Sequence, residues 1–412
     1  MLGGFPAAHL RRTIVIPQIQ GKDMAGNAFE DVVHQLDSHF STANQAWLLG
    51  AGISVEAGLP LMGALTTRVR ALGAEGDHGA LLELLIGELP ESAHIEQVLS
   101  QLADYSAIAT RLEAKAISVG GEEFTTDALH AAHTAILDDI ATTIRWGYVE
   151  AKGEVAEQIG TPEKPLPVAT HHREFVRALF EKRQAGRANR FKPTHFFTTN
   201  YDTLLEDALA LARIPAWDGF AGGAVAYRAH QYGQEPKVGG SRALVIKLHG
   251  SIDWVLGEDG GVWRVRDSDV YPEKKGRVLI HPQSTKYLST QRDPFASQFD
   301  LFRRTIGARD ELVLGVAGYS FGDEHVNEEI ERALLSADSK LTLIAFCMEG
   351  AALPEILREW LRSDAADRVF VLTEHGVHWG RRARIDDGNG TVFGWWKFTG
   401  TTAFLRTGSA TA

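Results

Sequence analysis

The stretch FFTTNYDTLLE, residues 196–206, joins a short apolar run to a polar turn and then to the start of an amphipathic helix. The apolar run is typical of a buried strand, and the turn places Asn200 and Asp202 at the carboxyl end of that strand. In doubly wound sheets, the loops at the carboxyl ends of strands face the crevice where ligands bind. The stretch therefore predicts a strand–turn–helix unit with two polar side chains beside a ligand, although either side chain would also serve as a plain cap of the following helix.

The same order of strand, turn and helix recurs along the chain. One unit spans about residues 46–70, and the others run from residue 194 to about 370. Apolar runs and amphipathic patterns predict strands at 243–248, 262–265, 277–280, 311–317, 341–346 and 369–372, and helices near 295–308 and 325–335. Repeated strand–helix units predict an α/β fold, a Rossmann-like, doubly wound, mostly parallel sheet with helices on both faces.

Residues 75–190 interrupt this order. Apolar residues recur there at spacings of three and four, as in HIEQVLSQLADY at 94–105, and such spacing is typical of amphipathic helices. A loop is expected at 157–170, where TPEKPLP contains three prolines. The segment therefore predicts a large helical insertion within the α/β domain.

These patterns divide the chain into three parts. We expect an N-terminal arm over residues 1–45 and a catalytic domain over 46–350 that carries the insertion at about 75–190. A tail over 351–412 is expected to contain a helix, a strand and a hairpin. The hairpin is predicted by DDGNG at 386–390, because these turn residues lie between two short aromatic runs.

The composition excludes several classes of protein. No segment approaches the ~18 uninterrupted apolar residues of a membrane span, and the first residues place their charges after the apolar stretch, unlike a secretory leader. The single cysteine, Cys347, excludes internal disulfides and a cysteine-built zinc site, which favours a reducing cytoplasm. The histidines at 171–172 and at 375 and 378 lack matching acids, so no metal site is predicted. With 53 acidic residues against 42 lysines and arginines, the net charge of −11 argues against strong nonspecific binding to nucleic acid.

A glycine-rich turn follows the first predicted strand, in WLLGAGISVEAGLP at residues 47–60. Gly50 and Gly52 leave the backbone N–H groups of the turn open to a phosphate, and a helix that begins there adds its positive end. A dinucleotide-binding fingerprint also needs a small residue where Val55 stands and an acid about 20 residues later, which is not found. On this stretch alone, a pyrophosphate site and a turn that merely connects strand to helix, with Ser54 as its cap, both stay open.

Two later strand ends carry polar residues in the same position. In VIKLHGSIDW, residues 245–254, His249 follows the strand and is a candidate general base, although a lone histidine is more often structural. In LVLGVAGYSFGDEHVN, residues 312–327, a turn at 318–320 is followed by Asp323. This second stretch suits a phosphate or a ribose, and equally a plain turn with Asp323 as a helix cap.

Taken in chain order, these turns resemble the signature of the sirtuin family. The resemblance covers about residues 46–350, and order, spacing and position at strand ends agree across its elements. The elements are a GAG-x-S turn (Gly50, Ala51, Gly52, Ser54), a glycine–apolar–proline element (Gly58, Leu59, Pro60), a T-x-N-x-D stretch (Thr198, Asn200, Asp202), an HG pair (His249, Gly250) and a G-x-S turn (Gly318, Ser320).

Two departures point to one branch of that family. Sirtuins that deacylate proteins carry four zinc-binding cysteines in a small lobe, whereas this chain has a single cysteine. They also follow the proline with a Phe–Arg pair, whereas Pro60 is followed here by Leu61 and Met62. The sequence is more similar to bacterial sirtuin-like NAD+ glycohydrolases of anti-phage defence, which deplete the cell of NAD+.

The resemblance implies NAD+ as the substrate, without a metal. It implies a catalytic set of Asn200, His249 and Asp202, and an NAD+-binding set made of Gly50, Ala51, Gly52, Ser54, Gly58, Pro60, Thr199, Gly318, Tyr319, Ser320 and Asp323. It also implies a homo-oligomer and a partner, either an ATPase of the HerA type or another phage-sensing protein, while direct binding to nucleic acid or membrane is not expected. Two other functions stay open: an NAD+-dependent protein deacylase, and a nucleotide-sensing or scaffold module without catalysis.

The residue types suit the chemistry of this reaction. Nicotinamide is positively charged in NAD+ and departs neutral, so cleavage of its bond to ribose through an oxocarbenium-like state needs no strong acid. Asn200 is expected to hold the attacking water or the ribose hydroxyls, and His249 to accept a proton near neutral pH. Asp202 is expected to orient Asn200 or to contact the nicotinamide side.

Overall fold

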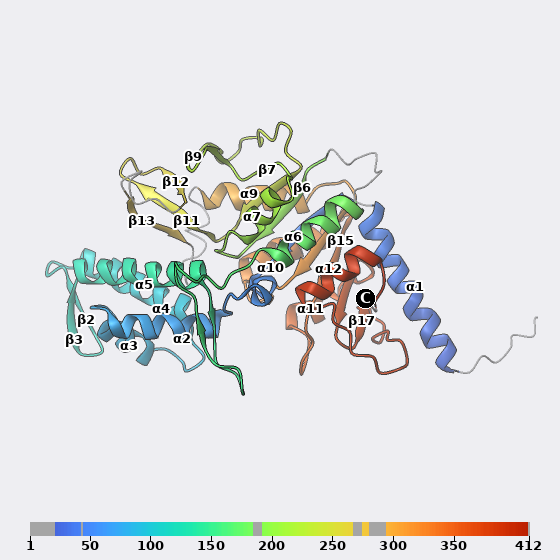
Figure 1. The fold of residues 1–412 in the computed structure, drawn as a ribbon, viewed down its shortest axis with the longest axis horizontal. Coiled ribbons are helices and arrows are strands. Elements are labelled where there is room, and N and C mark those ends of the chain that lie inside the picture. The colour runs from blue at the N-terminus through green and yellow to red at the C-terminus, as the bar shows by residue number, and fades with distance from the viewer. Residues whose placement is uncertain (1–20, 43, 184–191, 267–273, 280–293, 411–412) are drawn as a thin grey trace, which may run out of the picture.

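The structure of the protein is a computed structural model that describes residues 21–42, 44–183, 192–266, 274–279 and 294–410. Its centre is an eight-stranded sheet with helices on both faces (Figure 1). The strand order is β17 (Gly376–Trp379), β16 (Val369–Thr373), β15 (Leu341–Phe346), β14 (Leu312–Ala317), β1 (Asn44–Leu49), β6 (Thr194–Thr198), β10 (Ala243–Lys247) and β7 (Ala216–Trp217). All neighbouring pairs are parallel except β16 with β17. The predicted doubly wound α/β fold is therefore confirmed.

Each central strand is buried on both faces, which explains its uninterrupted apolar sequence. In β1, Trp47 and Leu49 point into the core on one face of the sheet, and Ala46 and Leu48 into the core on the other. The first core is covered by α1 (Gly21–Thr42), α6 (Thr170–Arg177), α7 (Leu204–Leu211) and α12 (Phe398–Thr407). The second is covered by α9 (Phe295–Ile306), α10 (Glu324–Leu335) and α11 (Glu355–Trp360).

The helical insertion forms a third core of its own. It contains α2 (Met62–Glu75), α3 (Gly79–Gly87), α4 (Ile95–Arg111) and α5 (Thr126–Trp146), together with the hairpin of β2 (Ala116–Val119) and β3 (Glu122–Thr125) and the short strands β4 (Tyr148–Val149) and β5 (Gln158–Ile159). The sequence did not predict these strands. Although it lies within the predicted range of 75–190, α6 packs instead with the main core, through Phe175 and Val176. Figure 1 shows the insertion at one end of the molecule and α1 at the other.

A second, antiparallel sheet follows directly after His249. Its order is β13 (Lys274–Leu279), β11 (Gly250–Gly257), β12 (Val262–Val265), β9 (Val225–Arg228) and β8 (Phe220–Gly222). The predicted strands at 262–265 and 277–280 belong to this sheet and not to the parallel one, and Ile280 lies outside the described residues. Since β11 and β13 contact α5, this sheet joins the insertion to the end of β10.

The tail differs from its predicted form. Residues 386–390 lie in bends and coil, and no strand is present between β17 and the end of the described chain at residue 410. The hairpin of the tail is instead β16–β17, at the edge of the main sheet, and the described chain ends in α12. Residues 1–20 of the expected arm lie outside the described residues, and the rest of the arm is mainly α1.

Within the described ranges, no helix has both the length and the hydropathy needed to cross a bilayer.

Candidate active site

The candidate site lies where the strand order of the main sheet reverses. β1 pairs with β14 on one side and with β6 on the other, and β6 pairs with β10. Leu49 is in register with Ala317 of β14 and with Thr198 of β6, and Thr198 is in register with Lys247 of β10. The four strands therefore end level with one another. The four turns singled out in the sequence meet at this carboxyl edge, which is the position where open α/β sheets bind ligands.

The glycine turn after β1 packs closely against the turn after β14. The N–H groups of Gly50 and Gly52 donate to the backbone oxygens of Ala317 and Gly318, at 3.0 and 2.8 Å. A Cβ atom on Gly50 would lie 2.5 Å from the oxygen of Gly318, and Gly318 itself has a φ of +64°. The glycines are thus required by this contact between two backbones, while the side chain of Ala51 is exposed at the surface of the turn.

The turn leads into the short 3-10 helix η1 (Ala51–Ala57), which carries Ser54 into the interior. Gly58 ends this helix in the left-handed conformation at φ 90°, and Pro60 follows it, partly buried. Ser54 is 1% exposed. The GAG-x-S motif therefore has a structural role, since it turns the chain so that the hydroxyl of Ser54 points inward.

Ser54 links the glycine turn to the TTNYD loop, residues 198–202 at the end of β6. Its Oγ donates to Oδ2 of Asp202 at 2.9 Å and accepts from Nδ2 of Asn200 at 3.3 Å. Nδ2 of Asn200 also donates to Oδ2 of Asp202, at 3.3 Å. Nε2 of His172 on α6 lies 3.4 Å from the same hydroxyl, and burial lowers the pKa of this histidine, an effect that Asp202 opposes. Asn200 and Asp202 thus share one buried cluster.

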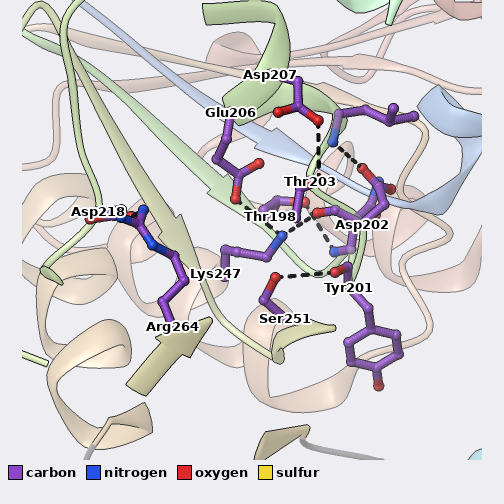
Figure 2. A network of polar contacts seen from close by, with 12 residues as sticks. Thr198, Tyr201, Asp202, Thr203, Glu206, Asp207, Asp218, Lys247, Ser251 and Arg264 are labelled. Atoms are coloured by element: carbon purple, nitrogen blue, oxygen red, sulfur yellow. Dashed lines mark hydrogen bonds and ion pairs between the residues drawn. The ribbon is translucent and has the colours of Figure 1, made fainter. Parts of the chain in front are cut away.

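Asp202 is held from two further directions. Its Oδ1 accepts from the N–H of Leu204 at 3.0 Å, at the start of α7, so the helix-capping role weighed from the sequence is present as well. Figure 2 shows Lys247 of β10 pointing to the backbone oxygen of Asp202, to which its Nζ donates, and to Glu206, whose Oε1 is 3.2 Å away. Burial raises the pKa of Glu206, and Lys247 opposes this rise. The loop is therefore fixed by charged groups beneath it.

The amide of Asn200 is only partly satisfied. Its backbone N–H donates to the hydroxyl of Thr198 at 3.0 Å, and its Nδ2 has the two partners described above. Its Oδ1 is buried and has no hydrogen-bond partner among the described residues. An unsatisfied buried acceptor costs about 1–3 kcal/mol, so this atom is a natural partner for a ligand hydroxyl or a bound water.

His249 lies at the end of β10 and contacts an acid from across the sheet. Its Nε2 is 2.8 Å from Oδ2 of Asp323, and both side chains are 9% exposed. The ring centroid of Tyr201 is 6.5 Å from that of His249. The TTNYD loop, to which Tyr201 belongs, therefore brings an aromatic ring near the histidine.

The other predicted residues have varied surroundings. Tyr319 is buried in the core, where its hydroxyl donates to the backbone oxygen of Asp323 and to Oδ1 of Asn327, both at 3.1 Å, and burial raises its pKa. Ser320 is exposed, and its Oγ accepts from the N–H of Gly322 at 3.3 Å. Thr199 is partly buried, and its N–H donates to Leu49 at 3.2 Å. Of these three, Ser320 has the side chain most open to solvent.

Three residues of this site were missed or set aside in the sequence. His172 was considered only as part of a metal pair, and it contacts Ser54 instead. Glu96 of α4 accepts a hydrogen bond from the hydroxyl of Tyr201 at 2.8 Å, and burial together with Glu96 raises the pKa of Tyr201. Lys247 stands inside the predicted strand, where a charge in an apolar run was the available signal. Among the described residues, no group of three or more His, Cys, Asp or Glu is arranged to hold a metal ion.

Comparison with known proteins supports a sirtuin-like family for part of the chain. Residues 194–366 match the family model described as SIR2-like domain. The matched range contains the TTNYD loop, His249 and Asp323, but not the glycine turn. None of the curated proteins matches the chain. Among solved structures, one described as the crystal structure of a Sir2 homolog–NAD complex is 16% identical, with 75% of this chain and 81% of that chain covered, at a TM-score of 0.33. At so low a score the likeness carries no argument about this site.

Proposed function

We propose that the protein is an NAD+ glycohydrolase that cleaves the bond between nicotinamide and ribose and releases nicotinamide and ADP-ribose. One observation carries this proposal: Asn200, whose Oδ1 is buried without a hydrogen-bond partner among the described residues, follows β6 at the same sheet edge where His249 follows the adjacent β10. The match to the SIR2-like domain over residues 194–366 supports NAD+ as the molecule consumed.

The residues at this edge fit a ribose. A sugar hydroxyl donates a hydrogen bond, and Oδ1 of Asn200 is an acceptor that lacks one among the described residues. Asp202 contacts Asn200 at 3.3 Å, and His249 lies at the same sheet edge; both side chains are buried. Buried polar groups around a reacting sugar act more strongly than the same groups in water, because the local dielectric constant is low.

Each residue then has a defined task. Asn200 holds a ribose hydroxyl or the attacking water through its amide. Asp202 keeps that amide in place through Nδ2, at 3.3 Å, and Ser54 does the same from the glycine turn. His249 accepts a proton as the new bond to the sugar forms, a step typically worth 10²- to 10⁴-fold in rate. We assign the pyrophosphate to the turn at Ala51 and the adenosine ribose to the turn at Ser320.

The leaving group explains why this set suffices. Nicotinamide leaves as a neutral molecule, so no acid is needed on its side of the bond and no metal is required. Catalysis rests on holding the sugar, on positioning the water and on removing its proton. In cellular terms we place this activity in anti-phage defence, with NAD+ depletion as the outcome and with control by homo-oligomerisation and a partner ATPase of the HerA type or another phage sensor.

The proposal is tested by following nicotinamide release from NAD+. Purified protein is assayed alone and together with the product of its neighbouring gene, for wild type, Asn200→Ala and His249→Ala. Both variants are expected to lose 100-fold or more in kcat. Asn389→Ala and His375→Ala, which remove exposed side chains of the same types, are expected to retain the wild-type rate.

The result also separates the competing functions. Nicotinamide that appears only when an acylated peptide is present would replace the glycohydrolase by an NAD+-dependent deacylase. A wild-type protein that binds NAD+ without any turnover under all these conditions would make it a nucleotide-sensing module. A measurable rate that neither site variant lowers would refute the assignment of the site.

A further inference from the structure

The contact between His249 and Asp323 joins two turns that are distant in the sheet. His249 follows β10, and Asp323 follows β14, with β1 and β6 between these two strands. Neighbouring strands are about 4.8 Å apart, so the two strands are separated by roughly 14 Å. The side chains nevertheless meet at 2.8 Å, Nε2 to Oδ2. The turn after β14 therefore brings its acid back across the carboxyl edge to the histidine.

Asp323 is anchored so that it cannot easily turn away. Its Oδ1 accepts from the N–H groups of His325 and Val326, at 3.1 and 3.5 Å, as the N-cap of α10. Its backbone oxygen accepts from the hydroxyl of Tyr319 at 3.1 Å. The N-terminus of a helix also favours a carboxylate in its charged form. One oxygen of the carboxylate is thus used by the helix, and the other faces His249.

The chemistry of the two groups decides where the imidazole proton lies. A carboxylate only accepts hydrogen bonds, so the nitrogen 2.8 Å from it must carry a hydrogen. In the neutral imidazole, hydrogen on Nε2 leaves the lone pair on Nδ1. A hydrogen-bond donor facing Nε2 would instead favour the other tautomer, with hydrogen on Nδ1.

We infer that Asp323 is a positioning residue that fixes His249 in the Nε2–H tautomer, so that Nδ1 is the atom that accepts the proton. This inference rests on the proposed function, because it specifies which nitrogen acts as the base. It gives Asp323 a role different from the ribose contact expected from the sequence. It also explains why the G-x-S turn is followed by an acid at the helix cap, since the cap aims the carboxylate.

The sharpest test is Asp323→Asn. Asparagine keeps an oxygen for the helix cap and nearly the same shape, but its Nδ2 is a donor and would face Nε2 of His249. That contact favours hydrogen on Nδ1, which removes the base. We expect kcat for nicotinamide release to fall 100-fold or more with KM changed less than threefold; the equivalent change in a serine-protease triad costs about 10⁴ in kcat.

Two further variants separate positioning from folding. Asp323→Ser keeps a good N-cap but supplies no carboxylate, so the histidine is free to adopt either tautomer and the loss in kcat should be smaller than for Asp323→Asn. Asp127→Asn, at an exposed site in the first turn of α5, should leave the rate unchanged. Equal losses in Asp323→Asn and Asp323→Ser would indicate a merely structural role and overturn the inference.

A second readout does not depend on turnover. With ¹⁵N-labelled histidine, the signals that vanish in His249→Gln identify the ring of His249, and their shifts report which nitrogen carries hydrogen in the neutral form. We expect Nε2–H in wild type and Nδ1–H in Asp323→Asn; Nδ1–H in wild type would overturn the inference. If wild type releases no nicotinamide while His249 shows Nε2–H, the proposed function fails, but the conclusion that Asp323 fixes the tautomer of His249 holds.

Discussion

The packing between the turn after β1 and the turn after β14 makes a strong prediction for Gly50→Ala. Gly50 has φ −111° and ψ −179°, an extended conformation that alanine adopts freely, so any cost must come from contacts. An added Cβ would lie 2.5 Å from the oxygen of Gly318 and 2.6 Å from Cα of Tyr319. Both atoms belong to the backbone and cannot rotate away.

The size of the effect follows from how firmly that backbone is held. The oxygen of Gly318 accepts from Gly52 at 2.8 Å, so retreat of the turn after β14 would break this hydrogen bond. Overpacking a closed site typically costs 1–3 kcal/mol, and the rigid neighbours here place Gly50→Ala at about 2–3 kcal/mol. By contrast, a Cβ atom on Gly63 of α2 would meet no atom of the described residues within 4 Å other than those of its own helix turn, so Gly63→Ala is expected to gain up to about 1 kcal/mol.

Urea denaturation of both variants, followed by tryptophan fluorescence, measures this difference. The midpoint should fall for Gly50→Ala and stay level or rise for Gly63→Ala. A Gly50→Ala protein with the wild-type midpoint and a raised KM for NAD+ would show that the glycine serves a phosphate and not the contact between turns. That outcome would refute the packing argument, because the predicted overlap would then cost nothing.

Three other substitutions probe two side chains beside the site and a histidine inside β6. Lys247→Met leaves the partly buried Glu206 without its ion pair at 3.2 Å and should lower the free energy of unfolding, measured by urea denaturation, by about 3 kcal/mol. Adding Glu206→Gln should restore part of the lost stability. If the double variant shows no recovery, the ion pair does not carry this stability. Tyr201→Phe removes the hydrogen bond to Glu96 at 2.8 Å and should cost about 1–3 kcal/mol in the same assay, together with part of the nicotinamide release; unchanged stability would argue against that bond. Burial lowers the pKa of His195 from 6.5 to about 4, so its neutral form is favoured in the fold. The unfolded chain takes up a proton at His195 as the pH falls below 6.5, whereas the folded protein does so only near pH 4, so the free energy of unfolding falls by up to about 3 kcal/mol over this range. His195→Gln should therefore lose less stability than wild type between pH 7 and pH 4.5. Equal losses in the two proteins would contradict this prediction.

The parallel sheet was predictable because its strands are buried on both faces. β14, β15 and β16 appear in the sequence as apolar runs whose ends agree with the structure to within one residue. The antiparallel sheet was predicted only in part: β12 and part of β13 were expected as strands of the parallel sheet, and β11 was missed because it mixes buried apolar residues with polar ones. β11 has the sequence GSIDWVLG, in which buried Asp253 and Ser251 hide the strand pattern. A one-dimensional pattern does not distinguish a polar residue that faces a partner from one that faces water.

The residues of the candidate site also divide into those that the sequence predicts and those that it does not. Asn200, His249 and Asp323 could be singled out as candidates because strand ends and helix caps are local features of the sequence. His172 and Glu96 were missed, because their contacts join segments far apart: 118 residues separate His172 from Ser54, and 105 separate Glu96 from Tyr201. Only the three-dimensional packing of α4 and α6 brings these side chains to the loop.

The TTNYD loop connects the helical insertion to the sheet edge through alternate side chains. Asn200 and Asp202 face Ser54 and the glycine turn, whereas Tyr201 between them belongs to the core of the insertion and bonds Glu96 on α4. Neighbouring residues of this one loop therefore face two different environments. A shift of α4 that moves the ring of Tyr201 must therefore also move the backbone that carries both polar residues. The insertion is in this sense part of the site's support, and its packing sets how firmly the amide of Asn200 is held.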